Sequence, residues 1–471
     1  MAFWNRRKSA DPADVRAEHR LTRTLSWPHL VALGVGAIVG TGIYTLIGVG
    51  ANLAGPAVIL SFLIAGAICA CAALAYAEMA TMMPASGSAY TYSYAVLGEA
   101  IAWIIGWSLI LEYSLVVSAV AVGWAGYANG FLQSIGWGLP TALASGPHAG
   151  GVVNLAAVFI IAVVAGMLSL GTKESATVNA VLVVFKIVAL AVFVAVALPH
   201  FNSANFEPFM PYGFAKAPDA AGVERGVMAA AAIIFFAFYG FDAISTAAEE
   251  TKNPSRDLAI GIVGSMLICT LVYVAVAAAA VGSMSFTAYA TSPEPLALIL
   301  RLLGQPGMAG IIAAAAIIAL PTVLLAFLYG QSRIFFVMAR DGLLPDTLAK
   351  VDKRTGTPIR ITMFTAVLVA ALAGVARLDE IAALANAGTL AAFTAVAVCM
   401  LVLRVREPDR VRTFRAPLPW VIGPAAILGC IYLFTSLPSM TQRYFLYWNI
   451  GGVVLYLVYG MRNSRLAKAG S

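Results

Sequence analysis

The sequence predicts an all-α polytopic membrane protein with 12 transmembrane helices. Of its 471 residues, 61% are hydrophobic and only 11% are charged, whereas a soluble globular chain is about 45–50% apolar and about 25% charged. The apolar residues fall in long runs of the length that a helix needs to cross a bilayer, about 20 residues. The runs lack strand-like alternation and are too long for barrel strands. Because backbone groups in lipid must be paired within their own segment, helices are the structure that remains.

The predicted spans are predominantly apolar stretches, and polar tails flank them at 1–29 and 462–471. A signal peptide is excluded, because the apolar run that follows the first tail begins at once and is too long. The twelve spans are 30–50, 57–82, 100–131, 152–170, 178–198, 226–248, 258–283, 307–331, 361–377, 382–403, 418–438 and 443–461.

The basic residues predict the orientation of these spans. Of the 29 lysines and arginines, 23 fall on the side that holds both tails and five on the opposite side, while Lys186 lies inside a span. Loops rich in Lys and Arg stay in the cytoplasm. We therefore expect a plasma (inner) membrane protein with cytoplasmic N- and C-termini, surrounded by the lipid bilayer.

The reactive residue types argue against an enzyme. All five cysteines lie within spans without metal-ligand spacing, and none of the four histidines lies in the middle of a span. A membrane enzyme would need clustered His, Cys, Asp or Glu, and a channel would show a polar stripe along its pore. Both stay distant alternatives. We expect no cofactor, no metal and no nucleic-acid partner, and the oligomeric state and a small membrane-protein partner are left open.

Span 1 is rich in glycine near its middle. Gly34, Gly36, Gly40 and Gly42 fall within nine residues, with Thr41 between the last two. Gly36 and Gly40 form a GxxxG pattern, which usually indicates close helix packing. The alternative is an unwound stretch between two half-helices, whose free N–H and C=O groups line a site within the membrane.

Span 6 is interrupted at a matching place, Tyr239-Gly240-Phe241-Asp242. Glycine weakens a helix, and Asp242 could cap a restarted one. Interruptions at corresponding positions of two halves indicate a transporter built from inverted repeats. We expect five-helix repeats at 30–198 and 226–403, with 418–461 outside them in a packing or dimerisation role.

Four stretches make the chain resemble the amino acid–polyamine–organocation transporters, and above all their cationic amino acid transporter branch and bacterial-type permeases. They are GAIVGTGIY (36–44), EMATMMPASGSAYTYSYAVLGE (78–99), FFAFYGFDAISTAAEETKNPSRD (235–257) and SRIFFVMARDGLLP (332–345). The resemblance implies a leucine-transporter-type fold of five plus five helices and two C-terminal helices, with helices 1 and 6 broken. It also implies secondary active transport of amino acids, commonly coupled to protons.

A zwitterionic substrate fits such breaks, because each of its charges is costly in low dielectric unless it is paired. A half-helix N-terminus carries free N–H groups and a partial positive charge. After Gly40, the N–H groups of Thr41 and Gly42 can hold the carboxylate. The resemblance assigns the ammonium to backbone carbonyls of Ile38, and of Phe236, Ala237 and Tyr239. Phe236 or Phe238 could be an aromatic lid, although packing is an equal alternative for Phe238.

Lys186 is an unusual residue for the middle of a span. A charge near the bilayer centre costs at least about 2.5–3.5 kcal/mol on insertion scales. Snorkelling toward the cytoplasm is one explanation; a buried lysine that carries the coupling proton is the other. The resemblance places this amine against the broken helix near Gly36, with Thr322 as a hydroxyl partner.

Two further ionisable residues are candidates. Glu112, in span 3, is either a structural carboxyl, a pocket acid for cationic side chains or a proton relay. Arg333, after span 8, is either a positive-inside anchor or part of an inner gate. We expect proton symport of small or medium neutral L-amino acids. Cationic amino acids stay possible substrates, because Glu112 could pair with a cationic side chain. The alternative is an amino acid exchanger without net proton coupling.

Overall fold

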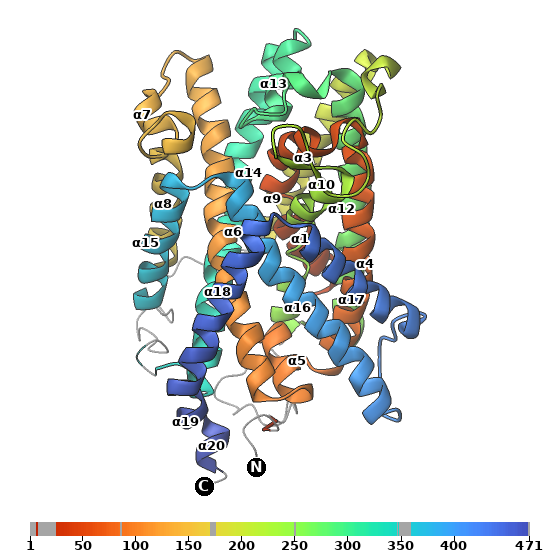
Figure 1. Ribbon diagram of the computed structural model, residues 1–471, viewed down its shortest axis with the longest axis vertical. Helices are drawn as coiled ribbons and strands as arrows, with labels where there is room; N and C mark the ends of the chain where they lie inside the picture. The colour runs from red at the N-terminus through yellow and green to blue at the C-terminus, as the bar shows by residue number, and fades with distance from the viewer. Residues whose placement is uncertain are drawn as a thin grey trace.

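The computed structural model describes residues 6–7, 25–84, 87–169, 176–248, 251–345, 347 and 359–469. Long helices stand along the long axis of the molecule, with α13 at one end and α20 at the other (Figure 1). The long or membrane-embedded helices are α1 (Trp27–Ile38), α3 (Leu46–Ala54), α4 (Val58–Met82), α6 (Glu99–Ser134), α8 (Leu155–Ser169), α9 (Ala176–Ala197), α10 (Val227–Ile234), α12 (Pro254–Ser283), α14 (Pro306–Arg340), α15 (Ile359–Val375), α16 (Leu378–Arg406), α17 (Pro419–Ser436) and α18 (Ser439–Leu455).

Shorter elements connect these helices. They are α2 (Thr41–Tyr44), η4 (Gly55–Ala57), α5 (Ser88–Val96), α7 (Thr141–Ala144), η5 (Pro147–Ala149), η6 (Leu198–His200), η7 (Ser203–Phe206), β1 (Ala217–Pro218), β2 (Glu224–Arg225), η8 (Phe235–Ala237), α11 (Asp242–Thr246), η10 (Phe286–Ala288), α13 (Pro295–Leu302), η12 (Tyr456–Gly460), α19 (Met461–Asn463) and α20 (Arg465–Ala469).

The predicted class, a polytopic helical membrane protein, is confirmed. Within the described ranges, nine helical segments are long and apolar enough to cross a membrane, and Trp27–Ile38, Leu155–Ser169 and Ile359–Val375 are shorter apolar helices. Large apolar side chains such as Phe159, Leu267 and Phe364 stand exposed on the flanks. A surface of that kind is suited to lipid rather than water. The count of twelve spans and the inverted repeat stay predictions.

Helix α6 lies at the centre of one half of the bundle, where it packs against α14 and α16, while α12 packs against α4 and α1. The pair α8 and α15 lies together on one flank (Figure 1). Helix α17 packs on α16 and α4. In α18, Trp448 stacks on Trp107 of α6, and each indole N–H donates to the other residue's carbonyl. Packing, one of the two roles expected for 418–461, is therefore present.

Residues near both ends of the chain meet at one end of the bundle, which we call the terminal face. Glu99 accepts hydrogen bonds there from Arg6, Tyr456 and Ser464. The opposite end, which we call the hairpin face, carries α13 (Figure 1) and the antiparallel β1–β2 hairpin, which contacts the end of α3 next to Leu53. Most of the predicted tail 1–29 lies outside the described residues.

Candidate functional site: two interrupted helices

The first interruption lies between α1 and α2. Helix α1 ends at Ile38, Val39 is extended, and α2 begins at Thr41 with Gly40 as its N-cap. As the first two residues of α2, Thr41 and Gly42 have N–H groups without acceptors inside the helix. The Thr41 hydroxyl donates to the carbonyl of Val120 in α6 at 3.5 Å.

The second interruption lies between α10 and α11. Helix α10 ends at Ile234, the chain tightens into η8, and α11 begins at Asp242. Gly240 has φ of +115°, which a residue with a Cβ rarely adopts. The Asp242 carboxylate accepts the Gly240 N–H at 3.0 Å and the Tyr113 hydroxyl at 3.1 Å. The expectation that Asp242 caps the restarted helix is wrong, because Phe241 is the N-cap of α11 and Asp242 is its first residue. The Asp242 carboxylate instead closes the turn before the helix through the Gly240 N–H.

The two interruptions touch each other at two points. A Cβ on Gly42 would overlap the Cα of Ala237, so these backbones are in direct contact. A Cβ on Gly240 would lie 2.9 Å from the carbonyl carbon of Ala37, at the end of α1. The start of α2 and the end of α1 therefore both meet the second interruption at one buried place inside the bundle.

Lys186 reaches this place from α9. Its side chain is completely buried, and its Nζ donates to the Gly36 carbonyl and to the Thr322 hydroxyl, both at 2.9 Å. Gly36 lies in the last turn of α1, where carbonyls lack partners within the helix. The amine therefore caps the first half-helix instead of pointing toward either membrane surface.

Helix α14 supplies Thr322 next to a proline. Pro321 has no N–H, so it leaves the Ile317 carbonyl without its helical partner. The indole of Trp124 in α6 donates to that carbonyl at 2.9 Å. The Thr322 hydroxyl donates a hydrogen bond to the Ala319 carbonyl at 2.7 Å and accepts one from the Lys186 amine.

The aromatic residues of span 6 separate into two groups. Phe236 lies edge-on to Tyr239, with 4.8 Å between ring centroids, and Tyr239 lies near Phe327 of α14. The Tyr239 hydroxyl is buried without a hydrogen-bond partner among the described residues. Phe238 instead packs with Phe62 and Tyr273. Of the two predicted lid residues, the structure brings Phe236 to the other site residues.

Glu112 lies on α6, where the backbone of Gly388 in α16 packs against its Cβ. Its side chain is buried, and the Thr389 hydroxyl of α16 is the neighbouring donor group. Val120, which marks the level of Thr41, is eight residues further along the helix, or roughly 12 Å. The Arg333 side chain lies outside the described residues.

The sequence that forms these two interruptions matches a known protein family. A family model for amino acid permeases matches residues 25–459, a range that contains both interruptions and Lys186. The chain belongs to the amino acid permease family. The resemblance drawn from the motifs is thereby confirmed, and this permease is a multi-pass transport protein rather than an enzyme.

Several curated relatives match the permease along most of its length. The branched-chain amino acid permease BcaP of Bacillus subtilis (strain 168) is 45% identical over 96% of both chains. The methylthioribose transporter of the same organism is 42% identical over 95% of both chains. Cationic amino acid transporter 2, vacuolar, of Arabidopsis thaliana is 39% identical over 88% of the permease and 64% of that protein.

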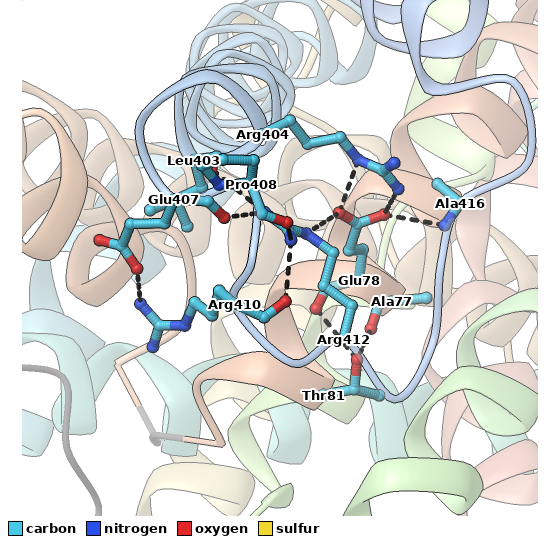
Figure 2. Close-up of polar contacts among 10 residues, drawn as sticks. All are labelled: Ala77, Glu78, Thr81, Leu403, Arg404, Glu407, Pro408, Arg410, Arg412 and Ala416. Atoms are coloured by element: carbon cyan, nitrogen blue, oxygen red, sulfur yellow. Dashed lines mark hydrogen bonds and ion pairs between the residues drawn. The ribbon is translucent and has the colours of Figure 1, made fainter.

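A buried ion-pair network joins three segments of the permease (Figure 2). The Glu78 carboxylate of α4 accepts hydrogen bonds from Nε and Nη2 of Arg404 in α16, at 3.0 and 2.5 Å. The same carboxylate accepts the Ala416 N–H at 2.8 Å and lies 3.3 Å from Nε of Arg412. Arg412 also donates to three carbonyls of the loop after α16, those of Glu407, Pro408 and Arg410, and to the Leu403 carbonyl in the last turn of α16. The network anchors this loop to α4 at the terminal face.

Two residues of the site escaped the sequence reasoning. Tyr273 of α12 donates to the Ile38 carbonyl at 2.7 Å, and Asn386 of α16 donates to the carbonyls of Ala232 and Ile233 at 2.7 and 3.1 Å. Asn386 carried a usable signal, because a buried amide inside an apolar span needs a partner. Tyr273 carried none, since tyrosine is common in such spans.

Proposed function

We propose that this permease is a proton-coupled symporter of small and medium neutral L-amino acids, branched-chain ones included, that works by alternating access. The observation that carries the proposal is the contact between the two interrupted helices, Gly42 against Ala237 and Ala37 against Gly240. It brings the N–H groups that begin α2 together with backbone carbonyls of the two interruptions, although the Ile38 carbonyl also accepts from Tyr273. Such backbone groups are the partners that a zwitterion needs in a low-dielectric interior.

In the proposed binding mode, backbone groups bind the carboxylate and the ammonium that all amino acids share. The N–H groups of Thr41 and Gly42 hold the carboxylate at the positive end of a half-helix. The carbonyls of Ile38, Phe236 and Ala237, with that of Tyr239, hold the ammonium. Because none of these groups is a charged side chain, the binding does not depend on the identity of the substrate side chain.

The surroundings favour a neutral substrate. Val323 of α14 lies 3.4 Å from where a Cβ of Gly40 would be, and Phe236, Tyr239 and Phe327 form the adjoining aromatic group. Glu112, the acid that a cationic side chain would need, lies eight residues before Val120 on α6, or roughly 12 Å along the helix from the level of Thr41, which holds the carboxylate. The relative whose name specifies branched-chain amino acids agrees with an apolar side-chain site.

Lys186 is the proposed coupling group. In the protonated form its ammonium ties the last turn of α1 to α14 through Gly36 and Thr322. Loss of the proton weakens this tie, because an ammonium hydrogen bond is stronger than a neutral one. The first half-helix can then move and open the site. We propose further that both termini are cytoplasmic, in the bacterial inner membrane, which makes the terminal face the inner one.

Uptake into proteoliposomes tests the proposal. The purified permease is given radiolabelled leucine, alanine or arginine, with and without an inward proton gradient. We expect leucine and alanine to accumulate with the gradient, and arginine not to. Uptake that requires amino acid inside the proteoliposomes and does not change with the proton gradient would favour the exchanger. Absence of both uptake and amino-acid-induced thermal stabilisation would contradict the proposal.

A further inference from the structure

Both interrupted helices end in the same way. Helix α1 has its C-cap at Val39, and the carbonyl three residues earlier belongs to Gly36. Helix α10 has its C-cap at Phe235, and the carbonyl three residues earlier belongs to Ala232. Each is the first carbonyl of its helix to lose its helical partner. An orphaned carbonyl that is buried costs free energy unless another donor reaches it.

A buried side chain reaches each of the two carbonyls. Lys186 Nζ donates to Gly36 at 2.9 Å. Asn386 Nδ2 donates to Ala232 at 2.7 Å and also to Ile233 at 3.1 Å. Lys186 and Asn386 are both completely buried. In the two five-helix units expected from the sequence, α9 and α16 each come fifth, so the two donors stand at corresponding places.

The orientation of the Asn386 amide follows from its contacts. Its Oδ1 has no hydrogen-bond partner in the described part of the chain. The reversed orientation would direct that oxygen at two carbonyl oxygens, which is repulsive. The nitrogen therefore faces α10.

We infer that Asn386 is a positioning residue for the substrate, and that it does for the second half-helix what Lys186 does for the first. The inference rests on the proposed function. Asn386 holds the end of α10, from which η8 presents the carbonyls of Phe236 and Ala237. An amide has no proton to lose or gain near neutral pH. The hold on α10 is therefore permanent, and only the hold on α1 can be released by a proton.

This asymmetry gives the two half-helices different tasks. The second half-helix keeps the carbonyls of Phe236 and Ala237 in place for the ammonium throughout the transport cycle, whereas the Ile38 carbonyl belongs to the half-helix that moves. The first half-helix moves when Lys186 changes its protonation state. A transporter with a titratable donor at both ends would lose its substrate acceptors and open its site in the same step.

Hydrogen exchange of the purified permease without substrate tests the positioning role directly. Asn386→Leu keeps the volume and removes the donor. We expect exchange in peptides covering 231–241 to rise about tenfold, which corresponds to one lost buried hydrogen bond. Exchange in 33–43 should stay unchanged. The matched control is Asn129→Leu, because Asn129 of α6 also donates to a carbonyl, that of Ala144, but away from the interruptions.

Each outcome decides the inference. A folded Asn386→Leu with unchanged exchange at 231–241 overturns it, and so does a uniform rise along the chain, because that would be global destabilisation. If the leucine variant does not fold, Asn386→Ala is measured in the same way. Failure of both variants to fold also overturns the inference, since a local anchor is not needed for folding.

Transport kinetics provide a second readout. We expect Asn386→Leu to raise the KM for leucine about tenfold, with Vmax changed much less, because the ammonium acceptors lose their preorganisation. A fall in Vmax alone would contradict the positioning role. A wild-type permease that binds no amino acid would defeat the proposed function, whereas the exchange experiment would still test Asn386.

Discussion

The Nζ of Lys186 lies 2.9 Å from the carbonyl oxygen of Gly36, 150 residues away in the sequence. The contact joins the middle of an intact helix, α9, to the end of an interrupted one, α1. Because the carbonyl has no partner within its own helix, the amine has a strong acceptor in a place where an unpaired charge would be costly. In the proposed coupling, a single proton on Lys186 controls how firmly α1 is held.

Replacing Lys186 with alanine should uncouple transport from protons. We expect gradient-driven accumulation of leucine to fall by more than about tenfold, since a charged hydrogen bond contributes about 1.5–3 kcal/mol. Counterflow of leucine should persist. The measurement is uptake into proteoliposomes with an imposed pH gradient. Lys216→Ala, which removes a lysine on the hairpin face bound to the Leu437 carbonyl, is the control. Wild-type accumulation by Lys186→Ala would refute the coupling role.

Gly42→Ala should abolish binding. Its new methyl group would overlap the backbone of Ala237, and neither chain can yield without separating the two interruptions. Gly310→Ala in α14 is the matched control, because nothing lies within 4 Å of its added Cβ, and alanine favours a helix by about 1 kcal/mol over glycine. Leucine-dependent thermal shift and uptake measure the effect. Equal binding by both variants would mean that the contact is not needed.

Glu78→Gln should destabilise the permease. The change leaves Arg404 and Arg412 without their buried carboxylate, and breaking a buried ion pair costs about 3–5 kcal/mol. We expect a clearly lower Tm in detergent. Glu380→Gln removes an exposed acid paired with Arg377 and should change stability by less than about 1 kcal/mol. If the two variants melt alike, the network does not stabilise the fold.

Glu294 should make stability depend on pH on the hairpin face. Burial raises the pKa of its carboxyl above the ordinary 4.5, and Arg301 only partly opposes this. A folded state with the higher pKa binds the proton more tightly than the unfolded state, so stability falls as pH rises from about 4.5 through the raised pKa. The Tm of the wild type relative to Glu294→Gln should therefore fall over that window and level off above it. A difference that grows with pH would contradict the sign.

Several features could be predicted from the sequence because they depend on local chemistry. The apolar runs predict membrane helices whatever their packing. Glycines on both sides of Thr41, and the glycine two residues before Asp242, mark places where a helix is easily interrupted. Lys186 stands out because a charge in lipid has a cost that some partner must offset. Its exact partners were predicted only with the help of the family resemblance.

The tertiary structure alone decided which side of each helix faces the site. Spans that are apolar all round carry no periodic signal of their inner face, so nothing local distinguished Phe236, beside Tyr239, from Phe238, beside Phe62. The partners of Asn386 and Tyr273 are backbone carbonyls on other helices. A carbonyl looks the same at every residue of a sequence. Only the place where a helix ends, and the helix that packs against that end, gives it a donor.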